Sequence, residues 1–99
     1  MSSRYDEVYR RSLRDPQGFW AEAAEALDWD RRWDKVLDDG RPPFYRWFAG
    51  GRLNTAYNCL DRHVMNGDGD RVALIYDSPV TDTVKHFTYA ELTRDVAKL

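Results

Sequence analysis

Apolar positions in the first quarter of the chain follow the spacing of a helix. They repeat every three or four residues from position 5 to position 13, and Ser3 with Asp6 resembles a capping box. Asp15 followed by Pro16 is a second helix start, because aspartate caps a helix and proline's missing N–H costs nothing in the first turn. The pattern predicts helices over residues 4–13 and from residue 16 onwards. The second helix would pack one side against a partner surface, namely Phe19, Trp20, Ala23, Ala24 and Leu27.

Residues 28–46 carry a weaker pattern. Their apolar positions fit either one face of a helix or an extended arm, and they are Trp29, Trp33, Val36 and Leu37. Asp39–Gly40 and Pro42–Pro43 interrupt the segment, and the prolines favour extended backbone. The first half holds all four tryptophans with little regular structure around them. We therefore expect this half to wrap over another surface rather than to enclose a core of its own.

A third helix is predicted after Asn54, which is a preferred N-cap residue. The helix would end at Asn66–Gly67, a normal stop signal. Its spacing directs three side chains towards a core: Tyr57, Leu60 and Val64. Three others are expected to point elsewhere: Asn58, Asp61 and Arg62. Cys59 lies mid-helix beside Leu60, so we expect a packed thiol rather than a nucleophile.

The last third of the chain reads as two strands and a helix. The run from Val72 to Tyr76 is continuously apolar and predicts a strand buried on both faces. A turn-rich connection through Asp82 leads to a second strand over residues 85–88. Thr88 with Glu91 forms a capping box for a helix that still continues at Leu99, so we expect the 99 residues to be part of a longer protein. The fold class predicted is α+β, mostly α.

Composition narrows the classes of function. Apolar residues make up 42% and aromatic residues 14%, which excludes a disordered tail. The net charge of −2, with both signs interspersed, predicts neither nucleic-acid binding nor attraction to an anionic membrane. The N-terminus lacks the apolar region of a signal peptide, and the longest apolar run is too short to span a bilayer. A single cysteine fits a reducing compartment, and we expect the cytoplasm.

The stretch "WFAGGRLNTAYNCLDRHV" raises the question of a phosphate site, because glycines precede a helix start. Gly50 and Gly51 have neither the spacing nor the lysine of a Walker loop, and they do not match a dinucleotide fingerprint. Arg52 beside the helix N-terminus leaves an anion site as an alternative. Asn54 already supplies an acceptor for that N-terminus, so capping is the favoured interpretation.

Other candidate chemistry is weak. The segment "NGDGD" imitates the start of a calcium loop, but Arg71 stands where that loop requires glycine. A plain turn explains it. His63 and His86 lie in no metal-binding spacing, and Asp38–Asp39 has no apolar pocket to separate two pKa values. From spacing alone, the sequence predicts no catalytic, cofactor-binding or metal-ligating residue.

Three stretches together resemble one family. They are "FWAEAAEALDWDRRWDKVLD", "RWFAGGRLNTAYNCLDRH" and "VALIYDSPVTDTVKHFTYAEL". Their order and spacing are similar to those of the N-terminus of short-chain acyl-CoA synthetases, and the resemblance runs from about Tyr5 to Leu99. Within the family, "PPFYRWF" and "ALIYDSPVT" look more like propionyl-CoA synthetase than acetyl-CoA synthetase.

The resemblance implies a two-step, AMP-forming ligase that uses ATP, Mg and CoA. It places residues 1–66 in an N-terminal helical cap and residues 67–99 at the start of an AMP-binding large α/β domain. The family's phosphate loop, carboxylate pocket and catalytic lysine would all lie after Leu99, so no site residue is carried over. Expected partners are the rest of the large domain and a neighbouring subunit. The alternative is a non-enzymatic module that docks a protein through its apolar helix faces.

Overall fold

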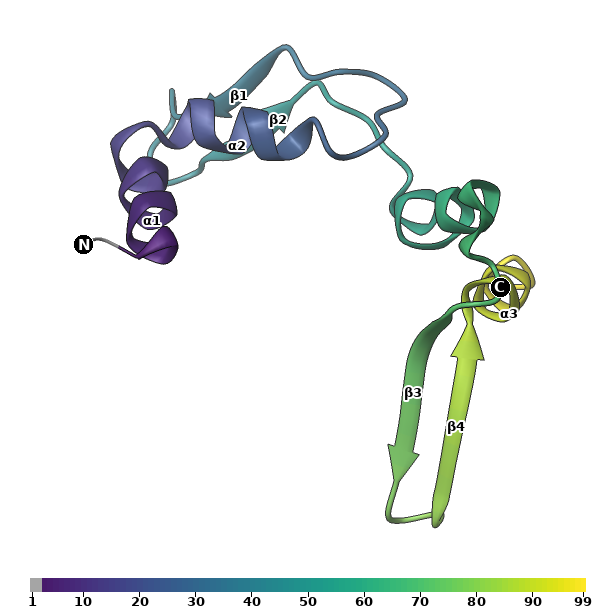
Figure 1. Cartoon of the computed structure of the whole chain (residues 1–99). Helices are drawn as coiled ribbons and strands as arrows, with labels where there is room; N and C mark the ends of the chain where they lie inside the picture. The colour runs from purple at the N-terminus through teal and green to yellow at the C-terminus, as the bar shows by residue number, and fades with distance from the viewer. Residues whose placement is uncertain (1–2) are drawn as a thin grey trace. The chain divides into compact units, whose positions relative to one another are not determined.

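The computed structural model describes residues 3–99, which fold into short helices and two antiparallel hairpins (Figure 1). Its internal contacts separate two compact units, one that ends at Leu53 and one that begins at Asn54. The α+β class predicted from the sequence is therefore confirmed for this chain. The boundary expected after residue 66 concerns the domains of a longer protein and stays a prediction.

The first unit opens with the two predicted helices, α1 (Arg4–Arg14) and α2 (Pro16–Ala24). The capping box of α1 is present: the Asp6 N–H donates to Ser3 Oγ at 3.1 Å and the Ser3 N–H donates to Asp6 at 3.0 Å. Asp15 caps α2 by accepting the Gly18 N–H at 3.0 Å. α2 ends at Ala24, so the helical face expected to reach Leu27 stops one turn earlier.

A hairpin follows where the sequence pattern left two alternatives. β1 (Lys35–Asp38) pairs antiparallel with β2 (Arg46–Ala49), and Leu37 lies opposite Trp47. The extended alternative for residues 28–46 is thus the correct one. The pattern did not predict the pairing itself, because β1 and β2 are four residues each and a seven-residue loop with two prolines separates them.

Four aromatic rings form what we call the aromatic cluster: Trp29, Trp33, Trp47 and Phe48. The centroids of Trp29, Trp33 and Phe48 lie 5.1–5.5 Å apart, and Trp47 lies 6.2 Å from Phe48. Trp29 Nε1 donates to the carbonyl of the buried Ala24 at 2.9 Å, which attaches the cluster to the end of α2. None of these four rings is buried, so the expectation that this half does not enclose a core of its own is confirmed for the described residues. Trp47 remains 45% exposed.

The second unit begins with two π-helical segments, η1 (Tyr57–Asp61) and η2 (Val64–Asp68). Gly67 adopts a left-handed φ of 93° and breaks the helix where a stop was predicted. The faces differ from the prediction: Asn58 is only 7% exposed, and Cys59 is exposed. Asn58 Nδ2 donates to the Asn54 carbonyl at 3.0 Å, which allows the amide to be buried.

The unit ends in a hairpin and a helix. β3 (Val72–Ser78) pairs antiparallel with β4 (Thr83–Thr88), with an irregularity between Val72 and Leu74. Asp82 takes a left-handed φ of 48° in the connecting turn. Helix α3 (Tyr89–Val96) has the predicted capping box: the Glu91 N–H donates to Thr88 Oγ1 at 3.2 Å, and the Thr88 N–H donates to Glu91 at 3.0 Å. α3 contacts β3 and β4, and it also contacts η1 and η2.

The expected burial of the strand at 72–76 is wrong for this chain. β3 forms, but Ile75 is 62% exposed and Leu74 is 47% exposed. The physical reason is that the hairpin has only two strands, and within residues 3–99 helix α3 is the one element that packs against it. The apolar run correctly predicts a strand, but its burial on both faces is not observed within the described residues.

The chain as a whole exposes more surface than its size requires. Its accessible surface is 8136 Å². A compact protein of this mass exposes about 5,800 Å², and even two separate compact proteins of half the mass expose about 7,000 Å² together. Among residues 3–99, Ala24 is the one buried apolar residue. None of the described helices has the length and apolar character needed to cross a bilayer.

Candidate functional site

The Gly50–Gly51 turn is held by the chain's own backbone. Gly51 N–H donates to the Phe48 carbonyl at 3.0 Å, and Arg52 exchanges backbone hydrogen bonds with Arg31 at 2.8 and 3.1 Å. Gly50 has a left-handed φ of 81°, which glycine adopts without a steric cost. The turn's conformation is therefore explained by its pairing with the segment that precedes β1.

Side chains also fill the space beside both glycines. A Cβ on Gly51 would lie 2.7 Å from the Trp29 ring, and one on Gly50 would lie 2.2 Å from the Asp34 carboxylate. Arg31 donates to the Gly50 carbonyl and pairs with Asp34 at 3.1 Å. A phosphate at this turn would meet an indole ring and a carboxylate. The structure therefore supports the interpretation that the glycines serve close packing.

Asn54 caps the following helix, as predicted. Its Oδ1 accepts the Tyr57 N–H at 2.9 Å, and its carbonyl accepts the Asn58 N–H at 3.1 Å. The amide oxygen thus satisfies one of the free N–H groups to which an anion would bind. Arg52 belongs to the first unit and Asn54 to the second.

The cap makes a testable prediction for Asn54→Ala. Losing the side-chain acceptor should weaken the helix by about 1 kcal/mol, seen as a fivefold to tenfold faster exchange of the Tyr57 and Asn58 amides. Asn54→Asp is the matched control, because aspartate caps equally well but repels an anion. If Asn54→Asp instead abolished calorimetric binding of CoA while Asn54→Ala retained it, an anion site would replace the cap as the explanation.

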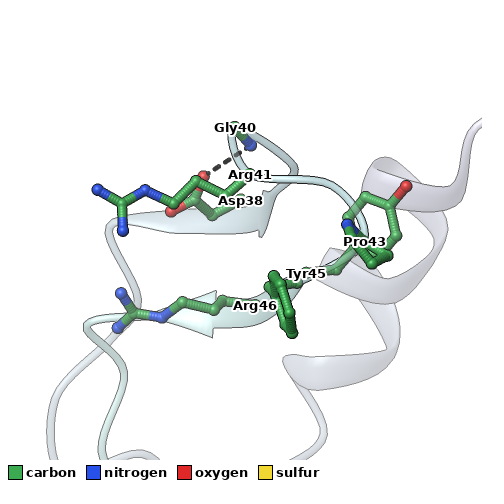
Figure 2. A pocket seen from close by; sticks show the side chains of 7 residues that line it. Asp38, Gly40, Arg41, Pro43, Tyr45 and Arg46 are labelled. Carbon is green, nitrogen blue, oxygen red and sulfur yellow. Dashed lines mark hydrogen bonds between the residues drawn. The ribbon is translucent and has the colours of Figure 1, made fainter.

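A hollow of about 840 Å³ lies beside the β1–β2 loop (Figure 2). Figure 2 shows Arg41 and Arg46 extending to the same side of the hairpin, with Asp38 nearby. Asp38 accepts the Gly40 N–H at 3.2 Å and lies 3.9 Å from Lys35 Nζ. The lining residues are Asp38, Gly40, Arg41, Pro43, Phe44, Tyr45 and Arg46.

The sequence analysis did not predict this hollow. The two arginines that flank "PPFY" are the feature of the sequence that could have indicated it. It is open to solvent, and its lining holds no serine, cysteine or histidine that would serve as a nucleophile or base. Asp38 lies directly opposite Arg46 in the strand register and offsets part of its charge. The hollow therefore presents two arginines, one carboxylate and two aromatic rings on an open surface.

The other residues considered for metal binding or catalysis do not form a common site in the structure. His63 packs against Tyr89 with ring centroids 5.1 Å apart, whereas His86 lies on β4. Asp68 lies 3.8 Å from Arg71, whose N–H donates to the Asp68 carbonyl at 3.0 Å, so the "NGDGD" segment is the end of η2 and the turn that follows it. Within residues 3–99, no group of three or more His, Cys, Asp or Glu side chains is placed to hold a metal ion.

Comparison with known proteins decides the family. The family described as "Acetyl-coenzyme A synthetase N-terminus" matches residues 5–59, which is more than half of the chain. The chain belongs to the short-chain acyl-CoA synthetase family. The match covers the aromatic cluster, the Gly50–Gly51 turn, the hollow and the Asn54 cap.

Individual synthetases extend the similarity to nearly all residues. The chain is 47% identical over 97 residues, 98% of its length, to the Homo sapiens protein named acyl-CoA synthetase short-chain family member 3, mitochondrial. It is 48% identical over 96% of its length to the acetyl-coenzyme A synthetase of Magnetococcus marinus, and 47% to that of Alkalilimnicola ehrlichii. The chain spans 14–15% of the length of these relatives.

Proposed function

We propose that the chain is the N-terminal segment of an AMP-forming propionyl-CoA synthetase. In the full-length enzyme, propionate would attack the α-phosphate of ATP to give propionyl-adenylate and pyrophosphate. The CoA thiol would then displace AMP and form the thioester. The similarity to named synthetases over 96–98% of the chain carries this proposal. Propionate as the acid is supported by "PPFYRWF" and "ALIYDSPVT".

The described residues do not fit the cofactors of this reaction. The Gly50–Gly51 turn is filled by Trp29 and by the Arg31–Asp34 pair, so ATP phosphates have no cradle there. Residues 3–99 also offer no cluster of ligands for Mg. We therefore place the binding of ATP, Mg and CoA in the adenylate-forming domain outside this chain, and we assign this segment a structural role.

The structural role is supported by exposed aromatic surface. Trp20, Trp47 and Phe48 line an apolar hollow of about 320 Å³ in the first unit, and Tyr5 and Tyr9 stack in parallel on α1 while remaining exposed. Surfaces of this kind mark contacts with other protein. We place the rest of the large domain on this side, together with a subunit contact that light scattering of the intact enzyme would detect. The cytoplasm remains the proposed location.

The proposal is tested with the full-length protein and with the 99-residue chain. We expect pyrophosphate release with ATP and propionate from the full-length protein, and none from the 99-residue chain. A pocket shaped for the extra methylene of propionate should favour it over acetate by about 10- to 200-fold in kcat/KM.

Two results would contradict the proposal. Equal or better use of acetate would replace propionyl-CoA synthetase by acetyl-CoA synthetase. Absence of any acid-dependent pyrophosphate release would favour the protein-interaction module instead.

A further inference from the structure

The loop between β1 and β2 carries charged side chains that the structure leaves unpaired. Among residues 3–99, Asp39, Arg41 and Arg46 form no ion pair with another side chain. Arg32 of the same unit differs, because its guanidinium pairs with Glu25. In Figure 2 the side chains of Arg41 and Arg46 extend to the same side of the hairpin, where the hollow is open to solvent. Two guanidinium groups are therefore presented together without a counter-charge bound to them.

Two aromatic side chains of the same loop are also exposed. Phe44 is 79% exposed and Tyr45 is 56% exposed. Arginine and aromatic residues are the types that are enriched at the centres of protein–protein interfaces and that carry most of the binding energy there. We call the following residues the loop patch: Asp38, Asp39, Arg41, Phe44, Tyr45 and Arg46. The loop patch has the composition of an interface centre.

The loop has a defined shape before any partner binds. The Phe44 N–H donates to the Arg41 carbonyl at 2.7 Å, and the Tyr45 N–H donates to the Pro43 carbonyl at 3.1 Å. Asp38 accepts the Gly40 N–H at the start of the loop. A preformed loop loses less conformational entropy on binding than a flexible one. More of the contact energy of its exposed side chains is therefore available for affinity.

The mixture of charges selects the kind of partner. An acidic partner would be attracted by Arg41 and repelled by Asp39, and a basic partner would meet the reverse. A second copy of the same loop carries both charges in the same arrangement. In a two-fold symmetric contact residue i meets residue j while j meets i, so one pair between Asp39 and Arg41 is formed twice. The planar guanidinium suits such a pair, because it binds a carboxylate through two parallel hydrogen bonds.

We infer that the loop patch is a contact between two copies of the full-length protein, in which Asp39 of each copy pairs with Arg41 of the other beside the Phe44 and Tyr45 rings. The patch lies within nine residues, 38–46. A standard interface uses about 20–30 residues on each side, so we expect a weak association with a dissociation constant in the micromolar range or above. The inference goes beyond the proposed reaction and does not depend on it.

Charge reversal at the two unpaired positions tests the pairing. Sedimentation velocity of the full-length protein at rising concentration measures its self-association. Arg41→Glu and Asp39→Arg each turn two attractive pairs into two repulsive ones, so each should weaken self-association by about tenfold. An equimolar mixture of the two variants should associate about as tightly as the unchanged protein. The reason is that the new carboxylate of one copy meets the new guanidinium of the other.

Three results would overturn the inference. The full-length protein could stay monomeric at several hundred micromolar. Both charge reversals could leave its self-association unchanged, which would place any contact between copies elsewhere. The mixture could associate no better than either variant alone, which would show that the loop does not meet its own copy.

Phe44→Ala tests the aromatic part of the contact. Losing a ring that is buried between copies should weaken self-association by about tenfold. Val80→Ala is the matched control, because Val80 lies in the second unit and is 93% exposed, and it should leave self-association unchanged. Unchanged association of Phe44→Ala would contradict the inference. So would a melting temperature lowered by several degrees in dilute, monomeric protein, because the ring would then pack within its own polypeptide.

These readouts do not use catalysis. Self-association through the loop patch without ligase activity would uphold the inference and refute the proposed reaction. Ligase activity in a protein that does not self-associate would do the opposite.

Discussion

Trp29→Ala should weaken the first unit by about 3 kcal/mol, near the lower end of the cost of removing a packed tryptophan. Trp29 contacts the rings of Trp33 and Phe48 at centroid distances of 5.1 and 5.5 Å, and each aromatic pair contributes about 1 kcal/mol. Its Nε1–H also donates to the Ala24 carbonyl at 2.9 Å. In hydrogen exchange of the full-length protein, the protection of the Asp34 and Arg52 amides should fall by about two orders of magnitude.

Trp29→Phe is the matched control for this prediction. Phenylalanine keeps an aromatic ring beside Trp33 and Phe48 but cannot donate to Ala24. The expected loss is about 1 kcal/mol for the hydrogen bond, with some further loss from the smaller ring. If Trp29→Ala changed exchange no more than Trp29→Phe, the ring contacts would contribute little, and the aromatic cluster would not stabilise this unit.

Gly51→Ala should cost about 2 kcal/mol although it adds a single methyl group. The new Cβ would lie 2.7 Å from the Trp29 ring and 3.1 Å from the Phe48 carbonyl, both closer than van der Waals contact permits. The ring is fixed by its own contacts, so either the ring or the turn must shift, and overpacking of this kind costs 1–3 kcal/mol. Exchange at the Arg31 and Arg52 amides should accelerate about thirtyfold.

Two further variants separate the clash from a general loss of flexibility. Gly69→Ala has its nearest neighbours at 3.5 and 3.6 Å and no left-handed φ, so it should be nearly neutral. In a Trp29→Ala background the clash partner is gone, and the cost of Gly51→Ala should fall below about 1 kcal/mol. If the cost of Gly51→Ala stayed the same without Trp29, the destabilisation would come from the backbone of the turn and not from the contact with the ring.

The helix starts were predictable because their signals are local. Ser3, Asp15, Asn54 and Thr88 all cap helices in the structure as their sequence contexts indicated. A cap depends on residues within three positions, so no knowledge of distant contacts is needed. The two strands β3 and β4 were also predicted from local patterns, although their pairing was not.

Contacts between distant residues and departures from regular geometry were not predictable. The pairing of Leu37 with Trp47 joins residues ten positions apart, and the aromatic cluster joins Trp29 and Trp33 to Trp47 and Phe48. The burial of Asn58 was not predictable from its polarity, because its side-chain amide donates to the Asn54 carbonyl in the folded helix. Phe48 has a left-handed φ of 50°, a conformation that costs a bulky residue about 1–2 kcal/mol and that only surrounding packing explains.

The candidate site was also predictable in its local features and not in its long-range contacts. Spacing alone argued against a phosphate loop at Gly50–Gly51, and the structure adds the reason why glycines stand there. The hollow beside the β1–β2 loop could not be foreseen, because it arises from how the loop between two unpredicted strands folds back. Family membership was inferred from the order and spacing of many residues along the chain, which rules for single helices and turns do not use.

The division of the chain into two units, each continuous in sequence, has a consequence for synthesis on the ribosome. Every contact within the first unit is available once residue 53 has emerged, and the same holds for the second unit at residue 99. Once the second unit has folded, the apolar side chains of β3 remain exposed, which makes Val72–Tyr76 the segment of these 99 residues that a nascent-chain chaperone is expected to bind.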